Sequence, residues 1–341
     1  MPSIVTVTRG DLVESVHRVS IAVADAEGRL VAWSGDPRLV AFWRSCAKPF
    51  QAIPLVVDGG ADRYGVGDDE LALACASHNG EPRHVELARG LLARSGATGE
   101  DLVCGPHSSL TESVAKAMDA RGERPTRLHN NCSGKHAAMI AAGRHSGAGS
   151  SGYHRPDHAV QRRCLREVAA WTGVAESGIP HGTDGCGVPS FALPLAAMAT
   201  AYARLGAAAM GDPVAGISGD VLRAARRIVG AIRANPFLIA GTDRLDTELL
   251  EVAEGRIVPK VGAEGVYSAA IPDLRLGLAL KVEDGALRAL IPAFLATLDE
   301  LAPGLAPDLA RHRHAPVKNT LGESVGEVEA RVILERSASK R

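Results

Sequence analysis

The sequence predicts a mixed α/β chain of the α+β type, with a largely antiparallel sheet built from both termini and packed against a helical region. Strand-like segments gather near residues 1–42 and 255–335, whereas helical periodicities fill residues 43–254. The 341 residues, 46% of them hydrophobic, can bury a large core. We expect one domain over residues 1–335 and a frayed tail over 336–341.

The elements follow from local patterns. The N-terminal strands are SIVTVTRG, HRVSIAVADAEG and RLVAWSGD, and the turn DAEG joins the last two. A helix is expected to begin near Ser45, which is suited to cap it, and to kink or end at Pro54. Further helical patterns run from DELALACAS to RLDTELLEVAEG, with Pro156 helping to start DHAVQRRCLREVAAWTG. The C-terminal part predicts the strands GRIVPKVGAEGVYSAAI and LRLGLALKVEDG, the helix LRALIPAFLATLDELAPG and the strand GEVEARVILER.

Charge and composition exclude several classes of protein. A net charge of −1 favours neither nucleic acid nor an anionic membrane, and RHRH at 311–314 is expected to be a solvated turn. The first residues carry no secretory signal, and the longest apolar run is interrupted by Pro189, Pro194 and Arg204, which indicates a core helix. Six dispersed cysteines indicate reduced thiols and a cytoplasmic location.

The stretch FWRSCAKPFQ places Ser45 and Lys48 one helical turn apart, so that a hydroxyl and an amine can meet. A lysine must be neutral to accept a proton from a serine, which needs its pKa to fall by about 3 units. Two other pairs, Ser113–Lys116 and Ser337–Lys340, have the same spacing in positions expected to be solvated. Spacing alone therefore leaves open a catalytic pair and a surface pair.

Three polar clusters follow, each with a structural alternative. CASHNGEP, with Ser77 at the end of an apolar helix, suits a turn into a cleft or plain helix termination. LHNNCSGKHAAM leads into a helix N-terminus and suits an anion site or a capping loop. HGTDGCGVP combines a hydroxyl, a carboxylate and a thiol with three glycines. Cys132 and Cys186 are either metal ligands or small buried side chains. Lys260 stands at a strand end in VPKVGAEG.

Taken together, these blocks resemble the thermolabile asparaginases of the rhizobial type, the asparaginase II family. The match is carried, in order, by RSCAKPFQA, ASHNGE, LHNNCSGKHAAM, GTDGCGVP, NPFLIAGTDRLDT and KVGAEG. With the flanking RGDLVESVHRVSIAVAD and NTLGESVGEVEA it covers nearly the whole chain. The resemblance implies a fold related to serine β-lactamases and serine-dependent glutaminases, and a homodimer that hydrolyses L-asparagine to L-aspartate and ammonia.

The resemblance also implies two Ser–Lys pairs, Ser45 with Lys48 and Ser77 with Lys260. We expect Ser45 to attack the carboxamide carbon while Lys48 takes its proton. Backbone N–H groups would hold the oxyanion, and the second pair would relay a proton to the departing ammonia and activate water.

The family's zinc site maps onto Cys132, Lys135 and Cys186, with a water as fourth ligand. Because an amine ligand must be deprotonated, metal binding there would depend on pH. We expect the metal to orient the substrate and keep the lysines neutral rather than supply a nucleophile. The side chains expected at the substrate are Arg44, Asn79, His129, Asn130 and Glu264, together with Asp184 beside the zinc site.

Two other functions compete with this interpretation. The chain could be a glutaminase or another serine amide hydrolase on the same scaffold, because one methylene in a pocket changes selectivity only about 10- to 200-fold. It could also be a zinc-binding structural protein whose serines act as caps. In that case Ser45→Ala would leave every function intact, while loss of Cys132 would unfold the chain.

Overall fold

The computed structural model describes residues 3–337 and divides the chain into two compact units. The sheet unit consists of Met1–Cys46, Leu193–Gly206 and Val252–Arg341. The helical unit consists of Ala47–Ala192 and Ala207–Glu251. Leu193–Gly206, which we expected in the helical region, groups with the sheet unit.

The sheet unit contains a nine-stranded sheet in which β10-β11-β1-β2-β9-β8-β7 are neighbours, β3 also pairs with β2, and β12 pairs with β3. The pairings in the described chain are antiparallel, as predicted. The strands are β1 (Ser3–Arg9), β2 (Leu12–Ala24), β3 (Leu30–Ser34), β7 (Val258–Val261), β8 (Val266–Ile271), β9 (Leu276–Val282), β10 (Ala315–Lys318), β11 (Ser324–Arg331) and β12 (Glu335–Arg336).

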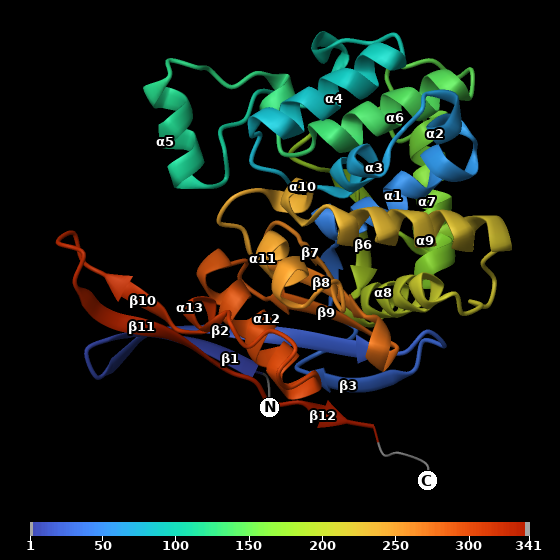
Figure 1. Ribbon diagram of the computed structural model, residues 1–341. Coiled ribbons are helices and arrows are strands. Elements are labelled where there is room, and N and C mark those ends of the chain that lie inside the picture. The colour runs from blue at the N-terminus through green and yellow to red at the C-terminus, as the bar shows by residue number, and fades with distance from the viewer. Residues whose placement is uncertain (1–2, 338–341) are drawn as a thin grey trace. The chain divides into compact units, whose positions relative to one another are not determined.

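The sheet is built from both ends of the chain, because β2 pairs with β9 on one side and with β1 on the other. The helix α12 (Leu287–Leu301) packs on β1, β8, β9 and β11, and Figure 1 shows it alongside the strands. The unit also contains β4 (Val40–Phe42) and the first part of α8 (Leu195–Met210). A Cβ on Gly277 of β9 would lie 2.0 Å from the Ala199 carbonyl oxygen, so only glycine fits against α8 there.

The C-terminal part differs from prediction in two places. Residues 311–314, expected to form a turn, lie mostly in the short helix α13 (Ala310–Arg313), and Arg313 pairs with Asp299 at 2.7 Å. Arg336, which we placed in the tail, pairs with Ala32 in strand β12. The remainder of the expected tail, 338–341, lies outside the described residues.

The helical unit holds most of the elements that lie, along the sequence, between the N-terminal and the C-terminal strands of the sheet. These are α1 (Lys48–Val57), α2 (Gly60–Arg63), α3 (Asp68–Cys75), α4 (Pro82–Arg94), α5 (Glu112–Ala120), α6 (Ser133–His145), α7 (Ala159–Thr172), α9 (Gly219–Ala234), α10 (Pro236–Ala240), α11 (Leu245–Val252), and the hairpin strands β5 (His181–Thr183) and β6 (Pro189–Pro194). Among the described residues, no helix combines the length and apolar character that a membrane crossing requires.

The centre of the helical unit is α1, which is buried from Lys48 through Leu55 and contacts α3, α6, α7 and α9. The predicted cap of this helix was wrong. Ser45 does not cap it, because α1 begins after Ala47 and Ser45 lies in a preceding 3₁₀ turn, Arg44–Ala47. Pro54, expected to kink or end the helix, does not end it, because α1 continues to Val57.

Candidate active site

The amine of Lys48 lies in the interior of the helical unit, with only 1% of the residue exposed. It donates to the Ser77 hydroxyl at 3.1 Å, to the Ala76 carbonyl oxygen, and to the Asn131 carbonyl oxygen at 3.4 Å. A buried amine is tolerated only when such acceptors surround it. The structure therefore joins Lys48 to Ser77, one member from each of the two predicted Ser–Lys pairs.

Ser77 stands directly after α3, where the chain becomes extended and is held by backbone hydrogen bonds. The Ser77 N–H donates to the Ile239 carbonyl oxygen at 2.9 Å, and the Asn79 N–H donates to the Ala240 carbonyl oxygen at 2.9 Å. The His78 N–H donates to the carbonyl oxygen of Asn131 at 3.2 Å. These bonds fix the predicted turn between α10 and the loop that precedes α6, so the Ser77 hydroxyl has a defined position.

Arg244 is a side chain at this site that sequence reasoning missed. Its guanidinium donates to the Asn79 side-chain oxygen at 2.9 Å and to the Ser77 carbonyl oxygen at 3.3 Å. Asn79 in turn donates to the Thr242 carbonyl oxygen at 2.9 Å. Arg244 lies in the block NPFLIAGTDRLDT, which carries part of the family resemblance but to which the sequence analysis assigns no role. Its place in that block is the sequence signal that could have identified it.

A stack of aromatic rings lies beneath the same turn. The rings of His78 and His84 are 4.8 Å apart at 10°, and those of His84 and Phe237 are 4.9 Å apart at 18°. Gly80 donates its N–H to Nδ1 of His78, which leaves Nε2 to donate to the Ser133 hydroxyl at 3.1 Å. Burial, followed by the nearby positive charges of His84 and Lys48, holds the pKa of His78 well below its usual value. The low pKa favours the neutral form of His78, and the stacked rings brace residues 77–81.

In the sheet unit, Ser45 lies in the 3₁₀ turn that precedes Lys48 along the chain. The residues flanking it anchor this turn. Trp43 donates its indole N–H to Ser268 at 3.1 Å, and the Cys46 carbonyl oxygen accepts from Tyr202 at 2.8 Å. The Ser45 hydroxyl itself has no hydrogen-bond partner among residues 3–337.

Lys260 is likewise in the sheet unit, on β7, and is 1% exposed. Its amine donates to the Val261 carbonyl oxygen at 3.0 Å, and its own carbonyl oxygen accepts from the Cys46 thiol at 3.0 Å. A Cβ on Gly262 would lie 3.1 Å from the Cys46 sulfur, which explains the glycine after Val261. Strand β7 therefore contacts the Ser45 turn directly.

The three predicted metal ligands come together in the helical unit. The Lys135 amine, 3% exposed, donates to the Cys186 sulfur at 3.0 Å. A hydrogen bond from Cys132, followed by the charge of Lys135, lowers the pKa of Cys186 to about 5. The same bond raises the pKa of Cys132 to about 12. Burial opposes the charged form of Lys135, but Cys186, Cys132 and Asp184 together raise its pKa. These shifts favour a thiolate on Cys186, a thiol on Cys132 and an ammonium group on Lys135.

This donor set fits zinc, because thiolate and amine donors are ligands that zinc accepts. Within the described part of the chain, no group of three or more histidine, cysteine, aspartate or glutamate side chains is placed to hold a metal ion. The Lys135 amine is therefore the donor that would complete the ligand set begun by Cys132 and Cys186. Asp184, whose carboxylate is 3.8 Å from the Cys186 sulfur, lies beside it as expected.

Of the other side chains predicted to contact the substrate, Asn130 and His129 form hydrogen bonds within the protein, and Arg44 and Glu264 are described by their backbone conformation. Asn130 donates to the Gly105 carbonyl oxygen at 2.7 Å and accepts from the Cys132 N–H at 2.9 Å. His129 accepts from the Thr126 N–H at 3.0 Å through Nδ1. The structure thus gives Asn79, Asn130 and His129 roles in holding loops. Arg44 and Glu264 both adopt positive φ, and Glu264 is exposed.

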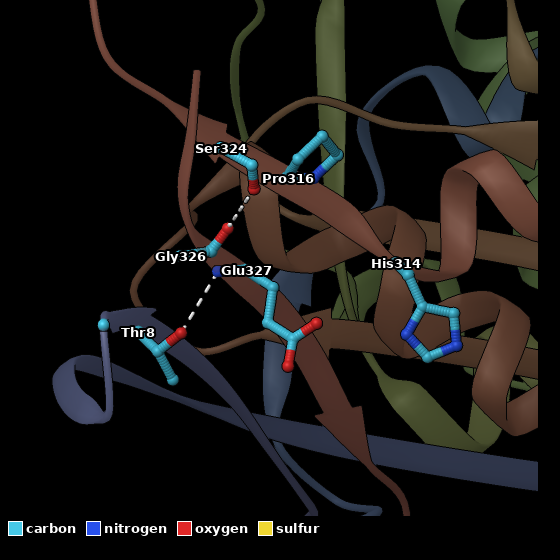
Figure 2. A pocket seen from close by; sticks show the side chains of 7 residues that line it. Thr8, His314, Pro316, Ser324, Gly326 and Glu327 are labelled. Carbon is cyan, nitrogen blue, oxygen red and sulfur yellow. Dashed lines mark hydrogen bonds between the residues drawn. The ribbon is translucent and has the colours of Figure 1, made fainter.

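A separate cavity of about 300 Å³ lies in the sheet unit, where β1 approaches β10 and β11 (Figure 2). The Glu327 N–H donates to the Thr8 hydroxyl there at 3.1 Å, and His314 lies on its rim. A Cβ on Gly326 would lie 1.9 Å from the Thr8 carbonyl oxygen, so the two backbones touch. None of the predicted site residues lines this cavity. It therefore has no part in the candidate active site.

A buried lysine amine bound to a serine hydroxyl is an arrangement that serine-dependent acyl-transfer enzymes use. The family model of L-asparaginase II matches residues 5–330, and the chain belongs to this family. No curated protein matches it. Among solved structures it is similar to Mglu in its native form (16% identity, TM-score 0.43, 83% of this chain and 63% of that one) and to a β-lactamase from Mycobacterium bovis (16% identity, TM-score 0.40, 83% and 94%). The chain thus spans less than two thirds of the length of Mglu.

Proposed function

We propose that this protein is an L-asparaginase, an amidohydrolase that converts L-asparagine and water to L-aspartate and ammonia. The observation that carries the proposal is the buried Lys48 amine, 3.1 Å from the Ser77 hydroxyl and one turn after Ser45, in a chain of the L-asparaginase II family. A serine nucleophile requires a base at this distance, and a lysine can serve once it is neutral.

In the proposed mechanism Ser45 attacks the side-chain amide carbon and Lys48 takes its proton. The i, i+3 spacing supports this pairing, because Ser45 lies in the 3₁₀ turn Arg44–Ala47 and Lys48 begins α1 directly after it, about one helical turn from Ser45. The bond between Lys48 and Ser77 supports a proton path from the amine to the Ser77 hydroxyl and from there to the departing ammonia. Lys260 is assigned to assist Ser77 in activating water for deacylation. Backbone N–H groups would stabilise the oxyanion.

Substrate recognition is assigned to polar groups that the fold holds in place. Arg44 and Glu264 remain our candidates for the α-carboxylate and the α-amine of L-asparagine. Asn79, His129 and Asn130 are braced by the protein, so their substitution would act on substrate binding partly through loop position. Arg244 joins this group as a positioning residue for Ser77 and Asn79.

Zinc is proposed as the resident metal, held by Cys132, Lys135 and Cys186 with Asp184 alongside. When bound, it would supply positive charge beside the reaction site. The protein residues set its pH dependence, because Lys135 and Cys132 must each release a proton before they can bind a metal. Zinc content measured by mass spectrometry on wild type and Cys186→Ser tests this assignment, and an equal content in both would refute it.

Two further assignments complete the proposal: a homodimer, which rests on the family resemblance, and a cytoplasmic location, which rests on the six dispersed cysteines. Sedimentation velocity tests the first, since a single monomeric species at micromolar concentration would overturn it. Immunolocalisation in the source cell tests the second, and enrichment of the protein outside the cytoplasm would overturn it.

The proposed activity is tested by ammonia release from L-asparagine and L-glutamine in parallel, with kcat/KM measured for each. We expect L-asparagine to be favoured by about 10-fold or more, the discrimination available from one methylene. A preference for L-glutamine would replace the substrate with that of a glutaminase. Absence of ammonia from both amides would reject the proposed function.

A further inference from the structure

A cavity of about 350 Å³ lies within the helical unit, between the β5–β6 hairpin and the turn that precedes α7. The hairpin contributes His181 and Thr183, and the turn contributes His154 and Arg155. His181 and Thr183 are two residues apart on a strand, so their side chains lie on the same face. Both are exposed. This cavity holds none of the residues assigned to catalysis or to zinc.

The polar groups of the cavity have few partners of their own. The Arg155 guanidinium makes no ion pair or hydrogen bond with any of the residues 3–337, and the same is true of the side chains of His181 and Thr183. Nδ1 of His154 is buried and also lacks a partner in the described chain. This contrasts with most arginines of the chain, such as Arg313, which binds Asp299. Arg155, His181 and Thr183 are exposed, so Nδ1 of His154 is the buried polar atom of this cavity. A buried polar atom is usually satisfied by the protein, by water or by a ligand.

The lining has a positive bias. No acidic side chain is among the lining residues, and Arg155 is charged at every accessible pH. The stem of Arg155 is held over the turn, because its Cδ lies 3.5 Å from where a Cβ on Gly152 would be. Its planar head has parallel donors that match two oxygens of an oxyanion. The His181 imidazole and the Thr183 hydroxyl add donors from the hairpin, and the His154 imidazole adds one from the same turn as Arg155.

We propose that this cavity is a binding site for a phosphate group, either as inorganic phosphate or on a small phosphomonoester. Donors converge from two separate elements, the strand β5 and the turn 152–156, which suits an oxyanion with three or four oxygens better than a flat carboxylate with two. The site lies beyond the proposed asparaginase chemistry and does not depend on it.

Some residues that line the cavity are neighbours in the chain of the proposed metal ligand Cys186. Thr183 and Gly187, which both line it, flank Asp184 and Cys186 in the chain. On the other wall, His154 follows Tyr153, whose hydroxyl is 2.6 Å from Nδ1 of His136. A phosphate held between Arg155 and Thr183 would therefore restrain the loop that carries Cys186.

The test is isothermal titration of the purified full-length protein with sodium phosphate and with glycerol phosphate, at constant ionic strength set by sodium chloride. Arg155→Gln is the main variant, and Arg166→Gln is its matched control, because Arg166 is an exposed arginine on α7 that does not line the cavity. We expect saturable binding to wild type and to Arg166→Gln. Loss of the Arg155 contacts should weaken binding about 10- to 100-fold. His181→Asn should weaken it by a smaller factor.

The arms of the experiment separate the outcomes. Tighter binding of glycerol phosphate than of inorganic phosphate identifies a phosphomonoester ligand, and the reverse identifies the free ion. Non-saturable heats, or equal affinity in Arg155→Gln and Arg166→Gln, would overturn the proposal. Tighter binding of succinate than of either phosphate would overturn it as well, because it would assign the cavity to a dicarboxylate. Since ammonia release is not measured, failure here leaves the proposed activity untouched.

Discussion

The substitution Gly134→Ala tests the packing of α6, the helix that carries the proposed metal ligand Lys135. A Cβ on Gly134 would lie 2.4 Å from the Leu73 carbonyl oxygen and 2.5 Å from Leu73 Cγ. Ordinary carbon contacts are about 3.5–4.0 Å, so α6 would have to move about 1 Å away from α3. Overpacking of this kind costs about 1–3 kcal/mol, and the better helix propensity of alanine returns at most about 1 kcal/mol. We expect the free energy of unfolding to fall by about 2 kcal/mol.

Gly230→Ala is the matched control, because Gly230 is an exposed glycine inside helix α9 and nothing lies within 4 Å of its added Cβ. There alanine should stabilise the protein by about 0.5–1 kcal/mol. Urea unfolding of both variants, with a common m value, measures the difference. If Gly134→Ala were as stable as Gly230→Ala, the packing of α6 on α3 described here would be refuted.

Three further predictions concern buried ionisable groups. Lys48→Met should lower ammonia release from L-asparagine by about 10²–10⁴-fold, whereas Lys116→Met on the exposed face of α5 should leave it unchanged; equal effects would contradict the role of Lys48. The thiolate of Cys186 can be followed in metal-free protein as the absorbance at 240 nm that wild type has and Cys186→Ser lacks. This absorbance should titrate with a midpoint of about 5, and a midpoint near 9 would contradict the lowered pKa of Cys186. Burial, followed by the charge of Lys135, lowers the pKa of His136 to about 3. Below pH 6.5 the unfolded chain therefore binds a proton that the folded chain does not bind, and the free energy of unfolding decreases as the pH is lowered. His136→Gln should remove about 1.4 kcal/mol per pH unit from that slope between pH 6 and 4, as measured by urea unfolding, and an unchanged slope would contradict it.

The sheet was predictable from sequence because its strands carry their own signals. β1, β2 and β3 alternate or run apolar with β-branched residues, and β7, β8 and β9 follow as short apolar runs. The start of α1 was not predictable, because Pro49 suits any first turn and a serine before it reads as a cap. The continuation of α1 past Pro54 was not predictable either, because the burial of Pro54 within the folded chain offsets the cost of its missing N–H.

The predicted metal ligands meet in space, although periodicity and spacing alone would not have brought Cys132 to Cys186. That assignment came from the family resemblance. The bond between Lys48 and Ser77 needs the folded chain, because it joins the start of α1 to the residue after Ala76. Arg244 is farther still along the chain, and a lone arginine in a loop has no local pattern that predicts its partner.

The most direct test of a Ser–Lys amidohydrolase is ammonia release from L-asparagine by wild type, Ser45→Ala and Ser113→Ala. Ser113 has a lysine at the same spacing but lies on the exposed helix α5, which makes it the matched control. We predict that Ser113→Ala retains wild-type activity and that folded Ser45→Ala loses at least about a thousandfold in kcat/KM. Activity of Ser45→Ala comparable to wild type would contradict the account and move the nucleophile elsewhere.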